Sequence, residues 1–143
     1  GGRAAPRLRV YAHGWYRSDR DPAAVGWLAR ETAAKGYTAL KIDPFGSNWR
    51  TLSDGELDLS LEILRAVRSA IGDGVGLIVE AHSRFDAATA EQVAKRLEPL
   101  HPLWLEEPVP YTDLRGYREL AAEAKQLEKE FSALDAESLK YVD

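Results

Sequence analysis

The sequence contains neither cysteine nor methionine among its 143 residues. Without cysteine, the chain can form no disulfide bond, no thiolate metal site and no cysteine nucleophile. A cysteine-free composition fits a cytoplasmic protein, which is the location we expect. Methionine is missing even at position 1, where the chain begins Gly1-Gly2-Arg3. We therefore expect a processed, excised or engineered piece of a longer protein.

Basic clusters and long apolar runs are also lacking. The net charge is −4 and the isoelectric point is about 5.4, and no basic stripe suggests a nucleic-acid partner. No apolar run approaches the roughly 20 residues that span a bilayer, and no signal peptide opens the chain. With 45% hydrophobic residues, the chain has the length and composition of one globular domain with a core. The sequence thus predicts no nucleic-acid partner and no membrane partner.

Four short apolar runs recur about every thirty residues, and each ends in a polar cluster. They are Leu8–Ala12, Thr38–Ile42, Val75–Val79 and Leu103–Leu105. Continuous apolar runs are typical of parallel strands that are covered on both faces. We therefore expect these runs to be strands of a parallel sheet.

The segments between these runs have helical periodicity and helix-end signals. The first opens at Asp21-Pro22 and closes at Gly36, the second runs from Ser53 to Gly72, the third from Asp86 to Pro99, and the fourth from near Asp113 to Ala124. Alternating strands and helices predict consecutive βαβ units with right-handed crossovers, so the expected fold class is α/β. In such folds, ligands bind at the carboxyl ends of the strands.

Acidic residues end the third and fourth apolar runs. Glu80 and Glu106 are 26 positions apart, which is one strand–helix–strand step, so they should lie at neighbouring strand ends. Two carboxylates there form a plausible seat for a divalent metal ion. His82 follows Glu80 by two residues, so it should point to the same side and handle protons. The alternative is that these carboxylates cap the next helix or pair with Lys41 or Arg84.

Lys41 and Asp43 share a face at the end of the second run. The Lys41 ammonium could reach a substrate carboxylate or a metal ligand; a salt bridge from Lys41 to Asp43 or Glu80 remains an open alternative. His13 ends the first run and could line the same pocket. Arg84 either binds a substrate carboxylate or braces Glu80. The candidate substrate-binding residues are thus Lys41, Asp43, His13 and Arg84.

Three motifs resemble the second, third and fourth strand ends of the enolase superfamily. They are Lys41–Gly46, Val79–Phe85 and Trp104–Pro108, and the resemblance is closest to the acid-sugar dehydratases of galactonate type within the mandelate racemase group. It runs from about Arg9 to Ala124 with order and spacing intact. It implies a magnesium-dependent lyase that removes the α-proton of a carboxylate substrate, stabilises the enediolate and expels the β-hydroxyl. The implied partner is a small acid sugar.

The resemblance also assigns roles to individual residues. Glu80 and Glu106 match the first two of three Mg²⁺ ligands. His82 matches the catalytic residue that protonates the departing hydroxyl, and Lys41 matches the first of two paired lysines near the substrate carboxylate. Asp43 departs from the pattern, because racemase-type members carry a second, basic lysine there.

In the superfamily, the third metal ligand lies on strand five and a His/Asp base pair on strands six and seven, beyond the motifs found here. The resemblance therefore implies a parallel (βα)4 half of a TIM-type barrel over residues 1–125. Residues 126–143 begin with a charged helical pattern that does not resemble the family, and we expect a helical tail there. The alternative is a catalytically silent structural or interaction module, because open strand edges favour association, including homo-oligomers. Another carboxylate-rich barrel enzyme, such as a sugar isomerase, fits the motif order less well.

Overall fold

The computed structural model describes residues 9–122 and residue 125. Its elements are α1 (Pro22–Ala33), β1 (Ala39–Ile42), α2 (Asp54–Ile71), β2 (Gly76–Glu80), α3 (Ala87–Leu97), the 3-10 helix η1 (Glu98–Leu100) and β3 (Trp104–Glu106). Residues 114–122 are also helical. The strands form one parallel sheet in the order β1-β2-β3, which confirms the α/β class with consecutive βαβ units. The helical tail expected at residues 126–143 lies outside the described residues.

The first of the four expected strands is reduced to a single bridge. Ala12 pairs with β1, because its N–H donates to the carbonyl of Ala39 at 3.0 Å and its carbonyl accepts from the N–H of Lys41 at 2.8 Å. The preceding Val10 and Tyr11 are 63% and 43% exposed, so no side-chain burial supports a longer pairing. Within residues 9–122 the sheet therefore has three strands where four were expected.

The helices begin where the sequence predicts. Asp21, Ser53 and Asp86 each accept a hydrogen bond from a backbone N–H in the first turn of α1, α2 and α3, which satisfies donors that a helix start leaves unpaired. Gly72 ends α2 with φ of +63°, a positive value that glycine adopts without steric cost. None of the helices in the described ranges has the length and apolar character needed to cross a membrane.

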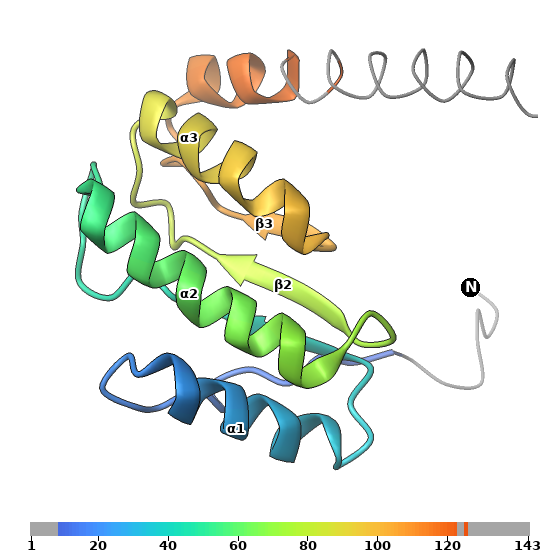
Figure 1. The fold of residues 1–143 in the computed structure, drawn as a ribbon. Coiled ribbons are helices and arrows are strands. Elements are labelled where there is room, and N and C mark those ends of the chain that lie inside the picture. Colours follow the sequence, from blue (N-terminus) through green and yellow to red (C-terminus); the bar gives the residue numbers. More distant parts are fainter. Residues whose placement is uncertain (1–8, 123–124, 126–143) are drawn as a thin grey trace, which may run out of the picture.

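The three long helices lie on the same side of the sheet (Figure 1). Alternate strand residues point towards them and form the core, namely Leu40, Ile42, Leu77 and Val79. Between α1 and α2 the backbones approach closely at Gly26, where an added Cβ would lie 3.2 Å from the carbonyl oxygen of Ala66. Because side chains alternate along a strand, the residues between these core positions point to the opposite face of the sheet.

Candidate functional site

Three charged side chains meet on the face of the sheet that points away from the helices. Glu80 and Glu106 are the last residues of β2 and β3, and the strand register pairs them directly. Lys41 pairs with Ile78, two residues before Glu80, which is about 7 Å along the strand at the usual rise per residue. The long lysine stem spans this offset. The Lys41 Nζ reaches Glu80 Oε2 and Glu106 Oε1, each at 2.9 Å.

This Lys41–Glu80–Glu106 cluster is largely withdrawn from water. The side chains are 9%, 4% and 31% exposed, respectively. Burial alone would lower the pKa of Lys41, but the hydrogen bonds and charges of the two carboxylates outweigh it and raise that pKa above its usual value. The hydrogen bond from Lys41 also holds the pKa of Glu106 below its usual range, against the opposing effect of burial. One ammonium between two carboxylates leaves an excess of negative charge, which favours a further cation.

Each carboxylate oxygen in the cluster already accepts a hydrogen bond. Glu80 Oε1 accepts from the backbone N–H of His82 at 2.8 Å, and Glu106 Oε2 accepts from Trp104 Nε1 at 3.2 Å; Lys41 donates to the other two oxygens. A carboxylate oxygen has two lone pairs, so these contacts leave acceptor capacity for a metal ion.

The donor set fits Mg²⁺ in kind, because this ion prefers hard oxygen ligands such as carboxylates. It does not fit in number. Across residues 9–122 no group of three or more acidic, histidine or cysteine side chains is arranged to hold a metal. Water or other donors would have to supply most of the six ligands that Mg²⁺ takes.

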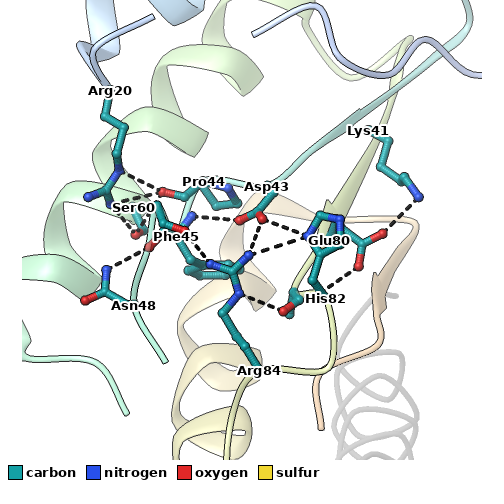
Figure 2. Close-up of polar contacts among 12 residues, drawn as sticks. Arg20, Lys41, Asp43, Pro44, Phe45, Asn48, Ser60, Glu80, His82 and Arg84 are labelled. Carbon is teal, nitrogen blue, oxygen red and sulfur yellow. Dashed lines mark hydrogen bonds and ion pairs between the residues drawn. The ribbon is translucent and has the colours of Figure 1, made fainter. Parts of the chain in front are cut away.

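A second polar network lies beside the cluster, at the loops that follow β1 and β2 (Figure 2). Its centre is Asp43, the residue directly after β1. Asp43 Oδ2 lies 2.8 Å from His82 Nδ1 and also accepts from Arg84 Nη2. Asp43 Oδ1 accepts from the N–H of Phe45 at 3.0 Å. The side chains of Asp43 and Arg84 are 13% and 8% exposed, whereas that of His82 is 53% exposed. The network thus presents one exposed imidazole on a buried ion pair.

The position of His82 depends on a turn after β2. His82 and Ser83 have φ values of +50° and +55°, in the left-handed region that non-glycine residues rarely adopt. The chain remains tied to the segment after β3, because the N–H of Ser83 donates to the carbonyl of Glu107 at 2.7 Å. We expected His82 on the same side as Glu80, which would require the strand to continue past Glu80. Instead the turn places the imidazole against Asp43.

Other predicted residues have different neighbours from those expected. Arg84 contacts Asp43 and does not reach Glu80, so it braces the loop carboxylate and not the strand carboxylate. Asp43 likewise contacts Arg84 and His82 instead of Lys41. His13 is exposed, and its ring packs edge-on against Tyr16 with centroids 5.8 Å apart. Within the described part of the chain, no hydrogen bond joins His13 to these residues.

Aromatic residues also border the cluster, a position that was not predicted for them from the sequence. The Tyr11 ring lies 5.3 Å from Lys41 Nζ, and Trp15 Nε1 donates to the carbonyl of Lys41 at 3.0 Å. Trp104 donates to Glu106. A signal for Trp104 was present, because it precedes Glu106 by two residues in β3 and so shares its face.

The chain is similar to proteins of known family. Residues 24–128 match the family described as enolase C-terminal domain-like, a region that contains the cluster and His82 but not His13. The D-gluconate dehydratase of Thermoproteus tenax is 45% identical over 118 residues, which are 82% of this chain and 24% of that protein. The D-gluconate/D-galactonate dehydratase of Picrophilus torridus is 37% identical over 109 residues, which are 76% of this chain and 28% of that protein.

Solved structures show the same likeness. The mandelate racemase/muconate lactonizing enzyme from Jannaschia sp. CCS1 superposes with a TM-score of 0.78 at 33% sequence identity, over 85% of this chain and 34% of that one. The chain thus spans about a quarter to a third of the length of the proteins it matches.

Proposed function

This chain belongs to the enolase C-terminal domain-like family, and from that membership we propose that it forms part of the active site of a magnesium-dependent acid-sugar dehydratase. The observation that carries the proposal is the cluster of Lys41, Glu80 and Glu106 at the carboxyl ends of three parallel strands. Relatives that match over this region are named dehydratases of gluconate and galactonate. The proposed substrate is a small sugar acid, and the reaction is removal of its α-proton followed by loss of its β-hydroxyl.

In this proposal the two carboxylates hold the metal ion. Glu80 is fixed by the backbone N–H of His82 and Glu106 by the indole of Trp104, so both are oriented before the ion arrives. A bound Mg²⁺ would supply charge stabilisation for the substrate carboxylate as the α-proton leaves. Lys41 adds a positive charge beside the same carboxylate, and the raised pKa of Lys41 keeps its ammonium charged at neutral pH.

His82 is the proposed proton donor to the departing hydroxyl. Its side chain is half exposed, and in the described structure only Nδ1 of the ring has hydrogen-bond partners. Nε2 is therefore available to a substrate. Removal of the α-proton needs a base, and the proposal assigns that role to none of the described residues. We accordingly expect no measurable turnover from the 143-residue chain alone.

A chimera tests the proposal. The 118 matched residues of the Thermoproteus tenax relative are replaced by the corresponding residues of this chain, and the product is assayed with D-gluconate and Mg²⁺. We expect dehydration, and we expect Glu80→Gln in the same chimera to abolish it. Circular dichroism establishes that both proteins fold. A folded chimera that is inactive where the parent is active contradicts the proposal.

The edge of β3 that faces away from β2 supports a second candidate, a module that associates through its sheet. Within residues 9–122, β3 pairs only with β2, and Leu103 and Trp104 are 48% and 46% exposed. Such edges are templates for pairing with another chain. Light scattering with size-exclusion chromatography should then show a dimer that Leu103→Lys weakens. A monomer at every concentration argues against this candidate.

A further inference from the structure

The carboxylate of Asp43 contacts the imidazole of His82 (Figure 2). We infer that Asp43 is a positioning residue: with Arg84 as its brace, it holds the His82 ring in one orientation and one tautomer, so that Nε2 is the atom that exchanges protons. This differs from the substrate-binding role that the sequence suggested for Asp43. The inference rests on the proposed function only for the identity of the group that receives the proton.

Asp43 has little room for a ligand. Its side chain is 13% exposed, and both of its oxygens have partners in the protein. Oδ1 accepts from the N–H of Phe45 at 3.0 Å, while Oδ2 accepts from Arg84 Nη2 and contacts His82 Nδ1 at 2.8 Å. A substrate hydroxyl would have to displace one of these contacts. Asp43 is therefore better placed to hold His82 than to bind a ligand.

The contact with Asp43 determines the tautomer of the His82 ring. An ionised carboxylate only accepts hydrogen bonds, and a guanidinium only donates them. At 2.8 Å, the contact between His82 Nδ1 and Asp43 Oδ2 requires a proton on Nδ1, because two lone pairs would otherwise face each other. An unprotonated Nδ1 could accept only from Arg84 Nη2, which lies 3.5 Å away, beyond the usual N–H···acceptor distance. The neutral ring therefore carries its proton on Nδ1, so Nε2 is the nitrogen that takes up a proton, and the imidazolium formed in this way donates that proton from Nε2.

Arg84 holds the carboxylate of Asp43 in place. Arg84 is 8% exposed and always charged. Its Nε donates to the carbonyl of Ala81 at 2.8 Å and its Nη1 to the carbonyl of Gly46 at 2.7 Å. These two carbonyls belong to the loops after β2 and β1, so one guanidinium joins both loops and aims Nη2 at Asp43. Arg84 thus fixes the position of the carboxylate and keeps a positive charge beside it.

The backbone of His82 is also held in place. Its N–H donates to Glu80 Oε1 at 2.8 Å, while its ring contacts Asp43. His82 is therefore held at both ends, although its side chain is 53% exposed. The left-handed φ of +50° costs free energy that the surrounding contacts must offset. The backbone N–H of the proposed proton donor, His82, thus binds one of the proposed metal ligands, Glu80.

The experiment is ¹⁵N NMR of the 143-residue chain with labelled histidine. The sequence contains three histidines, so His13 and His101 serve as internal references. In the neutral ring of His82, we expect Nδ1 to resonate as the protonated nitrogen and Nε2 as the unprotonated one. In Asp43→Asn, we expect this assignment to reverse or the two shifts to converge. Asp58→Asn is the matched control, because Asp58 also pairs with an arginine, Arg96, at 2.8 Å but contacts no histidine.

Two results would overturn the inference. One is a neutral wild-type His82 ring that carries its proton on Nε2, a measurement that needs no variant and decides the matter even if Asp43→Asn does not fold. The other is a folded Asp43→Asn chain with an unchanged His82 spectrum. Neither readout depends on turnover. An inactive chimera with the expected tautomer therefore contradicts the proposed function but not the positioning role of Asp43.

Discussion

Lys41→Met removes the positive charge between the two carboxylates and preserves most of the side-chain volume. Glu80 is then left as a carboxylate with a 4% exposed side chain and no cationic partner among residues 9–122, beside Glu106 at 31% exposed. Removing one member of a buried ion pair costs about 3–5 kcal/mol. Solvent screens the half of the cluster that Glu106 contributes, so we expect about 3 kcal/mol less free energy of unfolding. For a chain of this size that corresponds to a melting temperature about 10 °C lower.

Thermal and urea unfolding, followed by circular dichroism in the presence of a chelator, measure this loss. Arg96→Met is the matched control, because Arg96 and Asp58 form an ion pair whose side chains are 45% and 60% exposed, and exposed pairs contribute only about 0–1 kcal/mol. The reasoning is refuted if Lys41→Met is as stable as Arg96→Met. A second arm adds Mg²⁺. Because the ion no longer competes with an ammonium, it should raise the melting temperature of Lys41→Met more than that of the wild type.

Three further results are expected. The stability that the Lys41–Glu106 contact provides should be full between about pH 4.5 and 10.5, the usual values of the two groups. It should be lost as pH falls through the lowered pKa of Glu106 and as pH rises through the raised pKa of Lys41; a pH-independent difference between wild type and Lys41→Met contradicts this. In the chimera, Asp43→Asn should lower kcat about 100-fold at unchanged KM, because general acid catalysis contributes about that much; a higher KM at constant kcat would indicate a substrate ligand. His82→Asn should abolish loss of the β-hydroxyl but retain exchange of the α-proton with solvent deuterium, and simultaneous loss of both reactions would remove His82 from the proton-donor role.

The meeting of Glu80, Glu106 and Lys41 could be predicted because it depends on regular structure. Two acidic residues one strand–helix–strand step apart must lie at neighbouring ends of parallel strands. Side-chain alternation then places both carboxylates on one face, and a lysine near the end of the adjacent strand has the length to reach them. The sequence left open whether Lys41 pairs with Asp43 or Glu80. The structure pairs it with Glu80 and Glu106, because the strand register places Lys41 beside Ile78, two residues before Glu80.

The contact between His82 and Asp43 could not be predicted in this way. It depends on a left-handed turn at His82 and Ser83, and neither residue is the glycine that usually signals such a turn. The turn is supported by a local hydrogen bond to Glu80 and by a tertiary one to Glu107, in the segment after β3. The first expected strand was wrong in extent for a similar reason. The apolar run that contains Val10 suggested a buried strand, but no described element covers the Val10 side chain, which is 63% exposed.

The central claim is that Glu80 and Glu106 together form the metal-binding edge of this chain. Calorimetric titration of the 143-residue chain with Mg²⁺ tests it directly, with Glu80→Gln, Glu106→Gln and the distant surface variant Glu91→Gln measured in parallel. The account predicts weak binding, because two carboxylates leave most of the coordination shell to water. It predicts that either substitution at the strand ends abolishes this binding and that Glu91→Gln leaves it unchanged. Tight binding that survives both strand-end substitutions would place the site elsewhere and contradict the account.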